Sequence, residues 1–197
     1  MNALAPRPCA AAPPGPFLQM HSGYCVSLTE PDCAGLPLSD IALSLARTAR
    51  FRGATKGIYA YSVAQHSVFV ARLLREGGHG EAMQRAGLLH DAHEALIGDI
   101  PTPIKRWLGH HWLAARERPL IAALYQRFGV PPALAESPEV KGADALAFAT
   151  ERRDLMAASA WPWPSPCEPS PRHRITPEPE AQSFIAFMRL ADRLGLA

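Results

Sequence analysis

Residues 88–103 read "LLHDAHEALIGDIPTP", a stretch that combines the apolar residues of a core helix with many titratable groups. Leucines at 88, 89 and 96 recur at helical spacing, which predicts a helix over about 80–97 that stops at Gly98. Within ten positions lie five ionisable side chains: His90, Asp91, His93, Glu94 and Asp99. Because such groups are costly to bury without a partner, we expect them to serve a site inside a helical core.

Helical patterns continue on both sides of this stretch. Ser62 is a good N-cap for a helix that ends at the glycine pair 77–78, and Ser39 with Asp40 can cap the helix before it. The helices expected from apolar spacing and stop signals cover about 41–51, 62–76, 80–97, 101–108, 111–129 (kinked or divided at Pro119), 138–157 and 179–194. One strand-like piece, "YCVSL", precedes them. The sequence therefore predicts an all-α bundle of six or seven helices.

Two segments differ from the helical part in composition. Residues 1–19 are rich in alanine and proline, and we expect a disordered tail there, without the apolar region of a signal peptide. Residues 20–197 then form one domain, in which 159–178 is a long proline-rich loop. The length of 197 residues and the 48% of hydrophobic residues suit a single domain with a core of its own.

Bulk charge and cysteine usage narrow the class of protein. A formal net charge of +2 gives no support for binding a nucleic-acid polymer or a membrane surface. No apolar run approaches the roughly 18 residues that span a bilayer. The four cysteines form no CxxC pair, so we expect free thiols and a cytoplasmic protein. Leucine, phenylalanine and tryptophan on helical faces outside the core could form a contact between subunits, which is compatible with a homo-oligomer.

Two more polar residues occupy apolar positions on other helices. His66 lies among valines and a phenylalanine, and Asp144 lies between alanines. A lone histidine on an apolar face is usually satisfied by its neighbours in the core. Together with His90 and Asp91, however, these residues make a mixed set of imidazoles and carboxylates, which divalent metals such as Zn, Mn, Fe or Co accept. We expect one such ion, because it would neutralise groups that are expensive to bury alone.

Glu94 is the residue of the opening stretch that we expect to act beside the metal. On a regular helix it would lie roughly 6 Å along the axis from His90. His93 is expected to lie behind the site or at the surface. The chain holds no HExxH, GxSxG, Walker or GxGxxG motif, so other common catalytic motifs give no competing site.

The order of these residues resembles the HD-domain phosphohydrolases, in which a histidine, a His-Asp pair and a distant aspartate lie on a helical bundle. The segments "YSVAQHS", "LLHDAHEALIGDIPTPIK" and "VKGADALA" are similar to those of bacterial 5′-deoxynucleotidases and of small phage-type deoxynucleoside triphosphate hydrolases. The resemblance covers roughly residues 38–157. It implies a single HD-domain bundle, a nucleotide substrate and one divalent metal, which is Mn, Co, Zn, Fe or Mg.

The resemblance also implies a role for each matching position. It assigns Glu94 to water attack or proton transfer and Asp99 to the sugar or the attacking water. The metal ligands that it implies are His66, His90, Asp91 and Asp144. The residues that it implies for phosphate and sugar binding are Arg50, Lys105 and Lys141. Phe51 stands where the nucleotidases usually have tryptophan, which leaves base preference open.

The expected reaction is hydrolysis of a phosphate ester or anhydride by metal-activated water. A bound divalent ion lowers the pKa of its water toward about 7 and polarises the phosphorus centre. Glu94 would move the proton, and the cationic side chains would offset charge on the transferred phosphoryl group. Two alternatives stay open. One is another HD phosphodiesterase, acting on a cyclic nucleotide or on guanosine tetraphosphate, and the other is a non-catalytic ligand-binding module that kept the fold.

Overall fold

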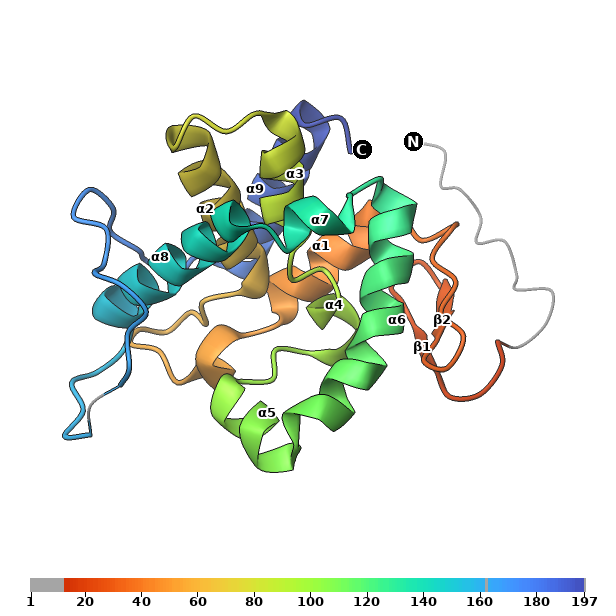
Figure 1. The fold of residues 1–197 in the computed structure, drawn as a ribbon, viewed down its shortest axis with the longest axis horizontal. Helices are drawn as coiled ribbons and strands as arrows, with labels where there is room; N and C mark the ends of the chain where they lie inside the picture. Colours follow the sequence, from red (N-terminus) through yellow and green to blue (C-terminus); the bar gives the residue numbers. More distant parts are fainter. Residues whose placement is uncertain (1–12, 162, 197) are drawn as a thin grey trace.

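The computed structural model describes residues 13–161 and 163–196. A short antiparallel hairpin comes first, in which β1 (Phe17–Gln19) pairs with β2 (Cys25–Ser27) so that Leu18 faces Val26. The rest of the fold is helical (Figure 1). The hairpin covers one end of the helical part and contributes Val26 to its core.

Helix α2 lies at the centre of the bundle and packs against four others (Figure 1). The five helices are α1 (Leu38–Arg47), α2 (Val63–Glu76), α3 (Glu81–Leu89), α8 (Pro138–Leu155) and α9 (Glu180–Arg193). The side chain of Ser62 accepts a hydrogen bond from the Gln65 amide, which starts α2 where the sequence predicts it. Because α2 is surrounded, even its polar His66 is fully buried.

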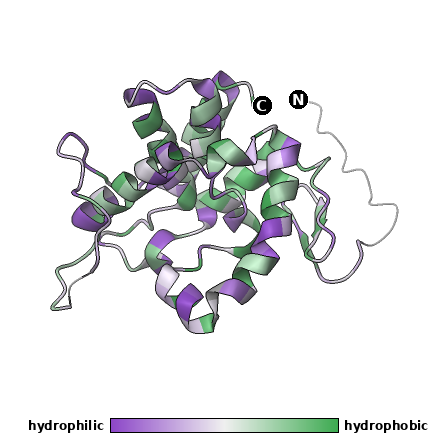
Figure 2. Cartoon of the chain, in the orientation of Figure 1, coloured by the Kyte–Doolittle hydropathy of each residue, from purple (hydrophilic) through white to green (hydrophobic). Residues whose placement is uncertain are grey.

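The remaining elements flank one side of this bundle. They are the 3-10 turn η1 (Arg50–Gly53), α4 (Glu94–Ile97), α5 (Thr102–Leu108), α6 (His110–Phe128) and α7 (Pro132–Ala135). Helices α5 and α6 pack on each other and are called the arm; in Figure 1 α5 lies below the bundle and α6 runs up its right-hand side. The distal part of α6 joins the common core through Leu124 and Phe128. Figure 2 shows hydrophobic residues recurring along the helices with hydrophilic residues between them, as one buried face per helix requires.

The expected helical fold is confirmed, with the small hairpin as its departure from an all-α protein. The single helix expected over 80–97 is wrong, because α3 ends at Leu89 and α4 starts at Glu94. His90 Nδ1 lies 2.8 Å from the Gly87 carbonyl oxygen, so the ring takes an acceptor that the regular helix would use. The following residues form tighter i to i+3 hydrogen bonds, such as Ala92 N to Leu89 O at 3.0 Å.

The first helix also differs from its prediction. It ends at Arg47 rather than near residue 51, because the Thr48 hydroxyl donates to the Ser44 carbonyl and competes with the next helical bond. Asp40 is no cap: it is buried and accepts hydrogen bonds from Ser22. By contrast, α6 runs through Pro119 as one helix.

The predictions for the N-terminal tail and for the proline-rich loop compare differently with the structure. Residues 1–12 lie outside the described residues, whereas Phe17–Gln19, placed in the disordered tail by composition, form β1 because their backbone pairs with β2. The loop 159–178 holds no helix or strand in its described part. None of the helices described in the structure is long and apolar enough to cross a membrane.

The second half of the proline-rich loop is nevertheless tied to the bundle. Arg153 donates from its two terminal nitrogens to the carbonyl oxygens of Ser170 and His173, each at 2.6 Å. Asp154 accepts a hydrogen bond from the Ile175 amide at 2.8 Å. Two neighbouring side chains at the end of α8 therefore hold a stretch of loop backbone by three bonds.

Candidate metal centre

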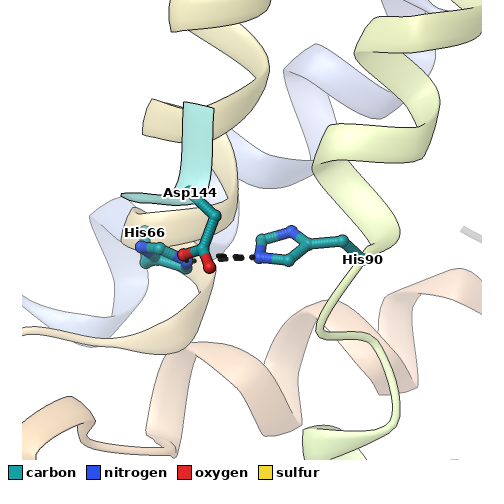
Figure 3. Close-up of side chains that lie close together, drawn as sticks. All are labelled: His66, His90 and Asp144. Carbon is teal, nitrogen blue, oxygen red and sulfur yellow. Dashed lines mark hydrogen bonds and ion pairs between the residues drawn. The ribbon is translucent and has the colours of Figure 1, made fainter. Parts of the chain in front are cut away.

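Three helices bring two imidazoles and a carboxylate together at the middle of the bundle (Figure 3). His66 comes from α2, His90 from the end of α3 and Asp144 from α8. One ligand atom from each lies within 4.8 Å of the others. His66 Nε2 is 3.2 Å from Asp144 Oδ1 and 3.3 Å from His90 Nε2. These three residues form a group that could hold a metal ion.

The hydrogen bonds behind the two rings orient them. His66 Nδ1 lies 2.6 Å from Glu151 Oε1, and His90 Nδ1 lies 2.8 Å from the Gly87 carbonyl oxygen. Both partners can only accept, so each Nδ1 carries a hydrogen, and each ring in its neutral form presents the lone pair of Nε2. Two lone pairs that face each other at 3.3 Å need a cation between or beside them. The arrangement therefore fits a metal ion, which binds the neutral ring through such a nitrogen.

Asp91 completes the ring of acceptors around the histidines. Its Oδ2 lies 3.2 Å from His90 Nε2 and 3.6 Å from His66 Nε2. Burial alone would lower the pKa of His90, but the carboxylates of Asp91 and Asp144 outweigh it and raise that pKa to about 9. Burial would raise the pKa of Asp91, but the nearby His90 holds it well below its usual value. The cluster thus attracts positive charge, either as protons or as a metal.

Arg50 is the arginine that the structure brings to this cluster. The backbone after α1 runs beside the start of α2, where Arg50 N donates to the Tyr61 carbonyl oxygen. Its Nη1 then lies 3.7 Å from Asp91 Oδ2, and its Nε donates to Glu151 Oε2 at 3.2 Å. Arg47, the neighbouring candidate, forms a surface ion pair with Glu180 instead.

Glu94 is buried at the start of α4, and its Oε2 has no hydrogen-bond partner among the described residues. Burial is the largest cause that raises its pKa, to about 9, followed by the negative charges of Asp91 and Asp99. Glu94 is therefore protonated at neutral pH and can donate.

Asp99 lies in the extended stretch after α4, close enough to Arg50 and Asp91 for their charges to shift its pKa. Partial burial raises its pKa, the Arg50 guanidinium opposes that rise, and Asp91 adds to it. His93 is also buried, which excludes the surface as one of its two expected positions, and its Nδ1 has no partner in the described part of the chain. Burial lowers the pKa of His93.

The two lysines stand apart from this cluster. Lys105 on α5 forms an ion pair of 3.0 Å with Glu117 on α6, so its ammonium group links the two helices of the arm. Lys141 is exposed on α8, one turn before Asp144, and its ammonium group makes no hydrogen bond or ion pair with the described residues. Of the two, Lys141 alone carries a charge that no described acidic residue pairs, because Lys105 is paired with Glu117.

Sequence reasoning missed Glu151. This carboxylate is fully buried on α8 and contacts His66 and Arg50, which are 85 and 101 residues away in the chain. A signal was present: Glu151 follows Asp144 by seven residues, which is two helical turns on the same face. A second carboxylate at that spacing indicates that the inner face of α8 carries polar groups at two positions, two turns apart.

Two known proteins are similar to most of this chain. An uncharacterized protein of Rhodobacter capsulatus, RCAP_rcc00048, is 38% identical over 145 residues, which are 72% of this chain and 74% of that protein. The uncharacterized protein YfdR of Escherichia coli K12 is 39% identical over 148 residues, which are 75% of this chain and 77% of that protein. No protein-family model matches the chain.

Proposed function

The chain belongs to the same family as RCAP_rcc00048 and YfdR, and we propose that it is a divalent-metal-dependent phosphohydrolase of the HD-domain type that acts on nucleotides. The observation that carries the proposal is the convergence of two imidazole Nε2 atoms and the Asp144 carboxylate within 4.8 Å, beside an arginine whose side chain is 11% exposed. The resemblance of "YSVAQHS", "LLHDAHEALIGDIPTPIK" and "VKGADALA" to nucleotide hydrolases supplies the substrate class.

Charge balance around the histidines supports a divalent ion. Asp91, Asp144 and Glu151 all have lowered pKa values and are ionised at neutral pH. Arg50 supplies one positive charge against these three negative ones. With both imidazoles neutral, two negative charges remain, which one divalent cation neutralises. Mixed nitrogen and oxygen ligands are those that Mn, Co, Zn and Fe accept.

In the proposed mechanism His66, His90, Asp91 and Asp144 hold the metal. The ion, when bound, activates a water molecule and polarises the phosphoryl group. Protonated Glu94 donates its proton to the oxygen that leaves phosphorus, a role that its raised pKa suits. Asp99, on the adjoining stretch, orients the sugar or the attacking water.

The cationic side chains have a separate part in the mechanism. Arg50 already faces the carboxylate of Asp91, and a phosphate oxygen bound beside the metal would lie within reach of the same guanidinium. Its charge offsets the negative charge that develops on the transferred phosphoryl group. Lys141 adds a second, more flexible contact to phosphate from the adjacent turn of α8.

Product analysis tests the proposal directly. The purified protein is incubated with each deoxynucleoside mono- and triphosphate and with Mn, Co, Zn or Mg, and products are resolved by ion exchange. Nucleoside plus phosphate identifies a nucleotidase, and loss of pyrophosphate or triphosphate from the triphosphates identifies the other branch. Cyclic nucleotides and guanosine tetraphosphate are included as competing substrates. Absence of any product with every substrate and metal would contradict the proposal.

A further inference from the structure

Glu151 joins three parts of the chain at one carboxylate. His66 Nδ1 lies 2.6 Å from Oε1, the Tyr61 hydroxyl donates to the same oxygen at 3.0 Å, and Arg50 Nε donates to Oε2 at 3.2 Å. Glu151, Tyr61 and His66 are fully buried. A carboxylate in such surroundings keeps its charge only when donors surround it, and here each of its oxygens has one or more.

Each of the two nitrogen contacts leaves a side chain with a defined orientation. The bond to Nδ1 assigns the hydrogen of His66 to that atom, so that Nε2 faces Asp144 and His90 without a hydrogen. The bond to Arg50 engages Nε and turns Nη1 toward Asp91 at 3.7 Å. A cation ligand and an anion-binding group are thus both oriented from behind by the same residue.

We propose that Glu151 is a positioning residue that sets the tautomer of His66 and directs the Arg50 guanidinium toward the site. Stability alone is a poor explanation for this carboxylate, because well-packed apolar residues often replace buried ion pairs without loss of stability. The metal-binding consequence rests on the proposed function. The orientation of the two side chains does not, because it exists in the protein without any metal.

The main test compares Glu151→Gln with the wild type in chelator-treated protein. At a pH where the ring is neutral, imidazole nitrogen NMR should show wild-type His66 with its hydrogen on Nδ1, whereas the amide variant should show a mixture of tautomers. Binding of inorganic phosphate should weaken about tenfold, because the guanidinium loses its charged anchor. Affinity for Mn should fall about 10- to 100-fold, the usual cost of losing the partner behind a histidine ligand.

Matched variants separate positioning from a general packing defect. Glu139→Gln makes the same chemical change at an exposed position of α8 and should leave the tautomer and both affinities unchanged. Tyr61→Phe removes one donor but keeps the charge, so we expect a lower melting temperature with a wild-type tautomer. If Glu151→Gln does not fold, Glu151→Asp serves instead, since a shorter carboxylate cannot reach both His66 and Arg50.

The inference is wrong if folded Glu151→Gln keeps the wild-type tautomer and the wild-type affinities for phosphate and Mn. It is also wrong if Tyr61→Phe loses as much affinity for phosphate and Mn as Glu151→Gln does. The experiment also separates two kinds of failure. A wild-type protein that binds no Mn and hydrolyses no nucleotide contradicts the proposed function. The tautomer and phosphate measurements still decide the role of Glu151 in that case.

Discussion

The site is built from two regions of contrasting structure, a helical wall formed by α2 and α8 and a turn segment of residues 90–101 that contains α4. On the wall, His66 and Glu151 are fully buried and partnered. In the turn segment, Glu94 Oε2 and His93 Nδ1 are buried without a hydrogen-bond partner among the described residues. The wall therefore holds its buried polar groups through hydrogen bonds, whereas the turn segment, which supplies His90 and Asp91, also carries buried polar atoms without such bonds.

Removing a ligand from the wall should have the largest effect. Asp144→Ala is the sharpest choice, because its side chain is 45% exposed and its loss leaves no buried cavity. We expect Mn affinity to fall more than about 100-fold, since loss of an outer partner alone costs about 10- to 100-fold. Titration calorimetry with Mn, beside Glu139→Gln on the same helix, measures this. Unchanged stoichiometry and affinity would remove Asp144 from the metal site.

Glu94→Gln should affect catalysis and leave the metal in place, which would set the turn segment apart from the wall. The amide has the shape of the protonated acid but cannot give up a proton, so kcat should fall about 10²- to 10⁴-fold. Near pH 7 Glu94 must take up a proton on folding and glutamine need not, so the melting temperature of the variant should rise. Steady-state kinetics and bound-metal analysis measure both effects. Metal loss equal to that of Asp144→Ala would instead place Glu94 among the ligands.

The pH dependence of stability gives a third, smaller effect. The pKa of His90 is raised to about 9, so its stabilisation is complete below about pH 6.5 and is lost as the pH rises through 9. Glu94 acts in the same direction, because the folded protein keeps a proton that the unfolded chain releases. The metal-free protein should therefore melt at lower temperature as the pH rises from 6.5 to 9.

Calorimetry in the presence of a chelator tests this dependence. The lowered pKa values of Asp91, Asp144 and Glu151 contribute only under acidic conditions and leave the alkaline window clear. Glu94→Gln should reduce the slope, because it removes one of the groups whose pKa is raised, while His90 and His66 remain. If the melting temperature instead rises with pH across this range, the pKa values of His90 and Glu94 are not raised as assigned.

The two lysines should give the smallest effects and differ from each other. Lys141→Ala removes a free ammonium group beside the wall, so KM should rise about tenfold, as loss of one charge-assisted hydrogen bond implies, with an unchanged melting temperature. Lys105→Ala breaks the ion pair with Glu117 and should lower the melting temperature of the protein by a small amount. Thermal melts and KM values of both variants reveal the difference. Equal shifts in KM would place both lysines at the substrate.

The wall was predictable from the sequence and the turn segment only in part. Helices α2 and α8 follow from apolar spacing, and the start of α2 follows from the serine cap at 62. Apolar spacing also predicted that one helix runs through His90. It failed there because spacing alone does not show that the His90 side chain competes for the Gly87 carbonyl oxygen. Glu151 lacked any local partner, and its contacts depend on packing between α2 and α8 that no local pattern shows.

The bonds from Arg153 and Asp154 to the proline-rich loop make its two halves unequal in their tolerance of change. The stretch between Trp163 and Glu168 is exposed, so extra residues there would lengthen the loop at a small cost in chain entropy. One residue inserted between Ser170 and Ile175 would put the carbonyl and amide groups out of register with the end of α8. Length variation among relatives should therefore accumulate before Ser170 and stop there.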